Sequence, residues 1–370
     1  MTQTPGFLWT LLFFLLAIGP LIFFHELGHY LVGRWNGVKA DVFSIGFGRE
    51  IAGWTDKRGT RWKVGWLPLG GYVRFAGDMS ASSEPSAEWK TLPVAERDMT
   101  FQSKALWQRA LIVVAGPVTN LALAAIIFAG IIAAYGMQVT PSVVGAVQPG
   151  SAAAKAGFQP GDTLTAVDGR ALSSFNDVAQ YVELRPMQLM TFDVTRGGKS
   201  IEIVAAPAED RTVDRFGNKG RRGRLGLGST APKIVQLPFY EIPGAAIKQT
   251  ASVLRSMVDG LGQLITGKRS LRELGGPIMI AKYSGQTAAM GFVTFLSFVA
   301  LISINLGFIN LLPIPTLDGG HLFFYAVEGV TRRPVSQTVQ EWAFRSGFLL
   351  LMGLMLFATF NDLAAFGPWR

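Results

Sequence analysis

Two histidines four residues apart, with a glutamate beside the first, are the part of the sequence best suited to chemistry. His25, Glu26 and His29 stand in the stretch His25-Glu-Leu-Gly-His29. On an α-helix the two imidazoles project from one face and can share a metal ion. Glu26 lies beside them and can take a proton from water on that metal, a pattern typical of zinc hydrolases. The alternative is a pair of helix-end histidines that only make hydrogen bonds.

The position of this motif favours the functional interpretation. It follows an apolar run from Phe7 to Phe24. Ionisable side chains at membrane depth are costly and usually mark a functional site. The chain as a whole is 49% hydrophobic and 16% charged, with a mean hydropathy of +0.31. These values indicate an integral membrane protein.

Residue types limit both the metal chemistry and the partners. The chain has no cysteine, so zinc would have to be held by His, Asp or Glu. The net charge is +9, but most Lys and Arg residues lie in loops beside apolar segments, where membrane orientation explains them. We therefore expect the lipid bilayer, and no nucleic acid, as a partner.

Four apolar segments can each cross a hydrocarbon layer of about 30 Å, which takes roughly 20 helical residues. They are approximately residues 7–33, 109–135, 291–312 and 344–361. No Lys or Arg precedes Arg34, whereas residues 34–109 hold twelve. The positive-inside rule then places the N-terminus outside and the first loop in the cytoplasm. Four spans return the C-terminus to the outside and put the metal site toward the cytoplasmic side.

A catalytic zinc site needs three protein ligands and one open position for water. His321 is the one histidine outside the first motif, and Asp318 lies three residues before it. Both stand in the stretch Asn310-Leu-Leu-Pro-Ile-Pro-Thr-Leu-Asp-Gly-Gly-His321. Chemistry alone leaves either side chain as the third ligand.

The two motifs together resemble the site-2 protease family of intramembrane zinc metalloproteases. Further matches are FSIGFG at 43–48, PLGGYVRFAG at 68–77 and GPVTN at 116–120, so the resemblance covers nearly the whole chain. It implies that Asp318 completes the zinc site with His25 and His29, and that His321 is a structural neighbour. It also implies single-pass transmembrane substrates, such as anti-sigma factors or signal-peptide remnants, trimmed first by an upstream protease. The implied location is the bacterial cytoplasmic (inner) membrane.

The stretch around the second motif has features of a substrate site. Asn305 and Asn310 lie in the third apolar segment, and because buried amides without partners are expensive in lipid, both should face the protein interior. Pro313 and Pro315 should end the helix and force an extended stretch, which membrane depth tolerates where it lines a cavity. Alternatively, the prolines simply end a helix at the interface. The resemblance implies that Asn310 positions substrate, and we assign Asn305, Pro313 and Pro315 to the same site.

Residues 37–106 contain short alternating runs that predict β-hairpin strands. An exposed strand edge could hold an unwound substrate by strand addition, and the related family has a membrane re-entrant hairpin at this place. The alternative is a small sheet that only packs the fold. Residues 80–98, rich in Ser, Glu and Ala, are typical of a solvated linker.

Residues 137–232 resemble one PDZ domain of the bacterial protease type, expected outside the cytoplasm. The pattern predicts a helix around 174–184, strands at 190–195 and 200–205, and a flexible loop at 214–224. Many relatives in Gram-negative bacteria carry two such domains. A PDZ domain can bind a peptide C-terminus by strand addition, or it can act as a plug that limits substrate size. Residues 238–265 have the spacing of an amphipathic helix, serving as a gate or only as packing.

The sequence therefore predicts a polytopic α-helical membrane protein with four transmembrane helices, a membrane-associated β-hairpin or sheet region and one inserted α+β PDZ domain. The expected parts are 1–36, 37–106, 107–136, 137–232, 233–290, 291–343 and 344–370. Zinc-activated water would attack the peptide bond with Glu26 as general base. Two other classes remain open: a metal transporter, which would need a polar path on both sides of the site, and an inactive PDZ scaffold.

Overall fold

The computed structural model describes residues 6–77, 93–172, 174–213, 219–266 and 275–366. The chain forms two compact units. The first comprises residues 1–128, 245–257 and 275–370, and contains both sequence motifs. The second comprises residues 129–244 and 258–274.

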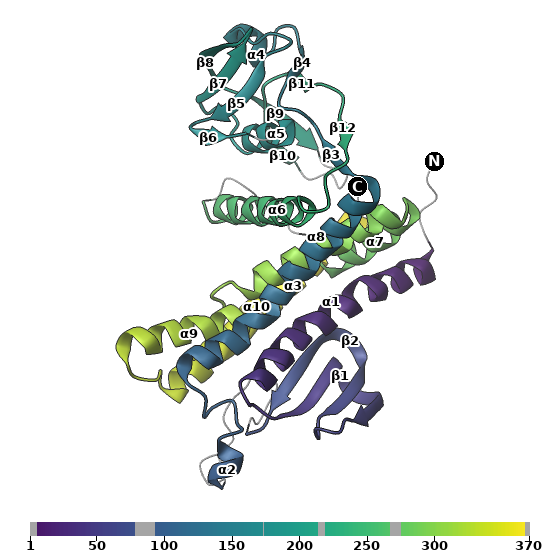
Figure 1. Ribbon diagram of the computed structural model, residues 1–370, viewed down its shortest axis with the longest axis vertical. Coiled ribbons are helices and arrows are strands. Elements are labelled where there is room, and N and C mark those ends of the chain that lie inside the picture. Colours follow the sequence, from purple (N-terminus) through teal and green to yellow (C-terminus); the bar gives the residue numbers. More distant parts are fainter. Residues whose placement is uncertain (1–5, 78–92, 173, 214–218, 267–274, 367–370) are drawn as a thin grey trace. The chain divides into compact units, whose positions relative to one another are not determined.

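Four helices are long and apolar enough to cross a membrane within the described part of the chain. These segments are residues 7–35, 106–135, 292–310 and 338–363. They belong to α1 (Phe7–Trp35), α3 (Leu106–Tyr135), α8 (Phe292–Asn310) and α10 (Gln337–Phe366) (Figure 1). The four predicted spans are thereby confirmed. Much of their apolar surface is exposed, especially on α10, as expected for helices that face lipid tails.

The helix before the third span was not predicted. Gly275, Gly276 and Pro277 suggest only a break in the pattern, but α7 (Pro277–Ala289) begins there. Proline is favoured at the first helical position because its missing N–H would have no partner there. The backbone N–H groups of Gly276 and Met279 donate to the buried carboxylate of Asp362 on α10, at 2.9 and 3.1 Å. A side chain far along the chain therefore completes the start of this helix.

A long antiparallel hairpin packs against α1, as Figure 1 shows. It consists of β1 (Ala40–Thr55) and β2 (Arg61–Phe75). In its turn, Asp56 accepts hydrogen bonds from the backbone of Arg58 and Thr60 and from the indole of Trp62. The hairpin shares a buried cluster with α1 and α3, including Tyr30, Phe43, Val73, Phe75, Phe101 and Ile112. This confirms the predicted strands and fixes the hairpin to the helices that carry the first motif.

The remainder of the region between the first two spans contains little regular structure in its described part. The short helix α2 (Val94–Arg97) follows Pro93. Most of the predicted linker, residues 80–92, lies outside the described residues.

The second unit is built from short strands and two helices. Its largest sheet has the order β6-β5-β7-β8, and three two-stranded sheets pair β9 with β10, β4 with β11 and β3 with β12. The strands are β3 (Met137–Val139), β4 (Val144–Val147), β5 (Thr163–Val167), β6 (Arg170–Ala171), β7 (Met190–Arg196), β8 (Lys199–Ala205), β9 (Ala208–Val213), β10 (Lys219–Arg224), β11 (Leu227–Ser229) and β12 (Lys233–Val235). The helices are α4 (Ala152–Ala156) and α5 (Phe175–Glu183).

The core of this unit follows the predicted pattern. Leu164, Val178, Phe192 and Val194 are fully buried or nearly so, and they come from β5, α5 and β7. The helix expected near 174–184 is α5, which Ser174 caps by a reciprocal capping box with Asp177. The strands expected at 190–195 and 200–205 are β7 and β8.

One prediction in this unit is wrong. Residues 219–224 were expected in a flexible loop, but they form β10, which pairs in register with β9 from Lys219–Val213 to Arg224–Ala208. The basic and glycine-rich composition suggested a loop, yet the backbone pairing depends on β9 rather than on these side chains. Residues 214–218 lie outside the described residues.

The amphipathic helix expected at 238–265 is α6 (Ile242–Ile265).

An ion pair in the second unit predicts an acid-sensitive fold. Asp162 is buried, and its two carboxylate oxygens accept hydrogen bonds from Arg196 at 2.7 Å each, with a further bond from the Gln159 backbone. The hydrogen bonds from Arg196 lower the pKa of the Asp162 carboxyl. This group therefore contributes stability above the ordinary carboxyl pKa, and that contribution is lost as the pH falls through the lowered value.

We expect amide hydrogen-exchange protection of β7 in the full-length protein to decrease below about pH 4. Asp162→Asn should lower protection at neutral pH and flatten this acid response, because the amide cannot lose a proton. Equal acid-induced loss of protection in the variant and the wild type would show that another group is responsible.

Candidate metal centre

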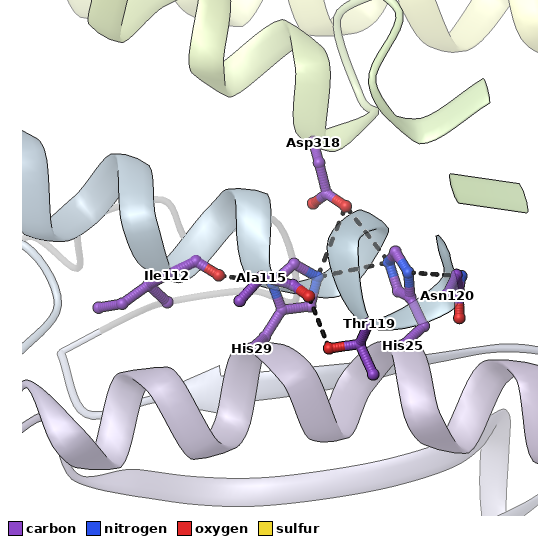
Figure 2. A network of polar contacts seen from close by, with 7 residues as sticks. All are labelled: His25, His29, Ile112, Ala115, Thr119, Asn120 and Asp318. Atoms are coloured by element: carbon purple, nitrogen blue, oxygen red, sulfur yellow. Dashed lines mark hydrogen bonds and ion pairs between the residues drawn. The ribbon is translucent and has the colours of Figure 1, made fainter. Parts of the chain in front are cut away.

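The first motif occupies the second half of α1, where hairpin β1–β2 and helix α3 cover it. His25 and Glu26 are each only 8% exposed. The Nδ1 atom of His29 lies 2.9 Å from the backbone carbonyl oxygen of Ile112 on α3. A carbonyl can only accept, so Nδ1 of His29 carries the proton and Nε2 is left with a free lone pair. Figure 2 shows both imidazoles on one side of α1, directed toward Asp318.

Asp318 reaches the histidines from the first residue of α9 (Asp318–Thr331). Helix α8 ends at Asn310, in agreement with the predicted effect of Pro313 and Pro315. The stretch between the two helices is not extended as predicted. It folds into turns, with the Leu317 N–H donating to Ile314 O at 3.1 Å. These turns allow α9 to begin at the level of the histidines.

Three side-chain atoms converge at one point. Asp318 Oδ2 lies 3.2 Å from His25 Nε2 and 3.5 Å from His29 Nε2, and the two Nε2 atoms are 3.3 Å apart. A tetrahedral zinc ion with bonds of 2.0–2.2 Å requires donor atoms about 3.3–3.6 Å apart. Asp318 Oδ2 is also buried without a hydrogen-bond partner among the described residues. The spacing, the orphaned oxygen and the nitrogen and oxygen donors all fit zinc.

Helix α3 closes the site from a third direction, and glycine makes this possible. A Cβ atom at Gly116 would lie 2.5 Å from His29 Cε1 and 2.9 Å from His25 Cε1. Any larger residue would push the imidazoles away. One turn further on, the fully buried Asn120 places its Nδ2 3.0 Å from His25 Nδ1. Both residues belong to the GPVTN stretch, whose contact with the metal-binding side chains the sequence reasoning did not find.

A cavity of about 660 Å³ opens onto these groups. Its lining includes His25, Glu26, His29, Asp318 and, from β2, residues 70–73. The Glu26 carboxylate accepts a hydrogen bond from the Val73 backbone. A Cβ atom at Gly71 would lie 2.8 Å from Glu26 Cγ, so β2 approaches this side chain closely because Gly71 has none. The hairpin therefore sets the position of Glu26.

The structure separates the other predicted site residues. Asn310 is half-buried and lines the cavity, whereas the described lining does not include Asn305, Pro313 or Pro315. Asn305 is also half-buried, and Pro315 packs against α10, where its backbone oxygen approaches Gly347. The expected roles of these residues in binding substrate stay predictions.

His321, the alternative third ligand, lies in the cavity wall, apart from the three converging donor atoms. The ring of His321 is 4.9 Å from that of Phe344 and 6.5 Å from that of Tyr325. Among the described residues, the group that could hold a metal consists of His25, His29 and Asp318. Geometry therefore favours Asp318 over His321, which chemistry alone could not.

Comparison with known proteins gives relatives along the whole chain. The chain is 42% identical over 357 residues to a protein of Agrobacterium fabrum named as a candidate zinc metalloprotease, and the match covers 95% of each chain. It is 43% identical to one of the same designation from Mesorhizobium japonicum, covering 96% of this chain and 99% of the relative. Metalloprotease MmpA of Caulobacter vibrioides is 38% identical, covering 99% and 98%.

Among solved structures, the PDZ domain of an SdrC-like protein from Listeria monocytogenes matches 25% of this chain and 92% of its own, with 19% identity and a TM-score of 0.20. This structural similarity is too weak to identify the second unit. The sequence model of peptidase family M50 matches residues 13–354 of this chain. The chain belongs to peptidase family M50, the site-2 protease family of membrane zinc metalloproteases.

Proposed function

We propose that this protein is an intramembrane endopeptidase that cleaves single-pass transmembrane segments. The observation that carries the proposal is the convergence of His25, His29 and Asp318 beside Glu26, with both histidines and Glu26 on α1, a helix apolar enough to span a membrane. Ionisable groups at membrane depth are costly, and those that are present usually mark a functional site. A protease whose site lies there has access to peptide bonds within the bilayer.

The residues of the site divide the chemistry between them. His25, His29 and Asp318 would hold zinc, which when bound lowers the pKa of water and polarises a carbonyl group. Glu26 lies next to His25 and faces the same cavity, so its carboxylate can take the proton from the attacking water and then pass it to the leaving amine. Asn310, in the cavity wall, can donate a hydrogen bond to the substrate backbone.

The β1–β2 hairpin can hold a substrate segment that has been unwound before cleavage. The backbone N–H and C=O groups of a transmembrane helix are hydrogen-bonded within the helix. The helix must therefore unwind locally before one of its peptide bonds can be hydrolysed. β2 pairs with β1 in a two-stranded sheet, and its residues 70–73 line the cavity. A released segment can add to the strand edge and lie across the cavity.

The resemblance to the family adds the substrate class and the location. We assign anti-sigma factors or signal-peptide remnants as substrates, trimmed first by an upstream protease, and the cytoplasmic (inner) membrane as the location. In the proposed orientation, both termini and the second unit are extracytoplasmic. Because of its PDZ-like pattern, the second unit would bind a peptide end or exclude substrates with bulky outer domains.

Glu26→Gln tests the general base. We expect this change to slow cleavage of a tagged model transmembrane segment by about 10²–10⁴-fold in detergent, while zinc stays bound, because the amide cannot accept the proton. Zinc content is measured on the same samples, and a chelator should abolish wild-type cleavage. Turnover at the wild-type rate would contradict the role of Glu26.

Asp318→Asn tests the third ligand, with His321→Gln as the matched control. We expect Asp318→Asn to weaken zinc binding by more than the roughly 10–100-fold that the loss of an outer-sphere partner costs. His321→Gln should leave zinc binding within a few-fold of wild type. The reverse pattern, measured by competition with a chelator, would identify His321 as the ligand.

Gly71→Ala tests whether β2 positions Glu26. The added methyl group overlaps Glu26 and Ile22, and overpacking of this kind costs about 1–3 kcal/mol. We expect cleavage to fall by on the order of 10²-fold, since small misplacement of a reacting group is costly, with zinc still bound. Gly19→Ala on α1, where nothing lies within 4 Å, is the control. Loss of zinc in Gly71→Ala would instead indicate general disruption of the site.

A further inference from the structure

The two histidines of the metal centre are held by different kinds of partner. Nδ1 of His29 faces the Ile112 carbonyl at 2.9 Å, and this oxygen can only accept. A proton of His29 is therefore held on Nδ1, which leaves Nε2 of the neutral ring for a metal. Nδ1 of His25 faces the side-chain amide of Asn120 at 3.0 Å. An amide can present either a donor or an acceptor, so the partner does not fix this tautomer by itself.

In the structure, Asn120 presents its donor. Its Nδ2 faces His25 Nδ1, and its Oδ1 is buried without a hydrogen-bond partner among the described residues (Figure 2). A donated hydrogen bond requires a lone pair on Nδ1, so the proton of neutral His25 lies on Nε2. Nε2 lies 3.2 Å from Asp318 Oδ2. In this tautomer Nε2 has no lone pair for a bond to a metal.

Metal binding through His25 Nε2 requires the opposite tautomer. Nδ1 must carry the proton, and its partner must accept. Rotation of the Asn120 amide by half a turn exchanges Nδ2 and Oδ1. Oδ1 of Asn120 can then accept a hydrogen bond from Nδ1–H of His25. The rotation adds no unpaired group, since it only exchanges which amide atom lacks a partner. Asn120 is fully buried, and Ser303 on α8 donates to its backbone oxygen at 2.7 Å, so only the side chain needs to move.

We propose that Asn120 is a positioning residue whose amide holds His25 in either tautomer: it donates to Nδ1 when the site is empty of metal and accepts from Nδ1–H when zinc is bound. This inference rests on the proposed zinc ligands. It explains why an uncharged residue with both donor and acceptor atoms stands at this point of α3. It also gives the GPVTN stretch a role, since Gly116 admits the imidazoles and Asn120 orients one of them.

Zinc affinity of the purified full-length protein in detergent, measured by competition with a chelator, tests the role of Asn120. Asn120→Leu removes donor and acceptor at similar volume, and should weaken zinc binding by about 10–100-fold. Asn120→Asp keeps an acceptor for Nδ1–H and should restore most of that loss. Thr119→Val is the control, because the Thr119 hydroxyl donates to the Ala115 carbonyl on its own helix. Unchanged affinity in Asn120→Leu, or equal loss in Asn120→Asp, would overturn the proposal.

The tautomer itself can also be followed directly in the wild type. The chain has three histidines, so a protein labelled with ¹⁵N-histidine gives few imidazole signals, which single replacements assign. We expect the His25 proton on Nε2 without zinc and on Nδ1 with zinc, and the His29 proton on Nδ1 in both states. A His25 proton on Nδ1 in both states would overturn the rotation. Failure of the wild type to bind zinc would instead contradict the proposed function.

Discussion

The mutual contact of one carboxylate and two imidazoles is the constraint on which the first unit depends. Asp318 Oδ2 lies within 3.5 Å of both Nε2 atoms, although it comes from a helix nearly 300 residues further along the chain. With or without a metal, these three atoms face one another among apolar helices, where unpaired polar groups are costly. Either way, α1 and α9 must meet at one point, and helix α3 must leave room for that contact at Gly116.

Other contacts keep α3 and α9 in the arrangement that this point requires. Arg109 on α3 donates to Glu328 on α9 at 2.8 Å, and its guanidinium lies over the ring of Tyr325 at 5.0 Å. Arginine suits this position because its planar group can pair with a carboxylate and stack on an aromatic ring at once. The two helices are thus joined near the start of α3 as well as at the metal centre. This second link is a direct contact between side chains of α3 and α9 and needs no metal ion.

Local patterns in the sequence were sufficient for the spans and for bringing the two histidines together. Apolar length predicts α1, α3, α8 and α10, and helical spacing places His25 and His29 on one face. The missed features depend on partners that are distant in sequence. The start of α7 depends on Asp362 of α10, and β10 depends on its pairing with β9. The contact of Asn120 with His25 depends on the packing of α3 against α1. The residues alone left Asp318 and His321 open; the resemblance to the family implied Asp318, and the turns before α9 place its carboxylate beside both imidazoles.

Those turns also show that the position of Asp318 is imposed by its surroundings. Thr316, two residues before it, has a φ of 85°, which is rare for a β-branched residue. Backbone of this kind costs on the order of 1–3 kcal/mol and persists where neighbouring contacts over-determine it. Here those contacts are close: a Cβ atom at Gly320 would lie 2.5 Å from the Ile314 carbonyl oxygen, so the first turn of α9 packs directly on the preceding backbone. The two glycines after Asp318 therefore have a structural reason, because they let a strained turn fold back tightly enough to aim a carboxylate at two histidines.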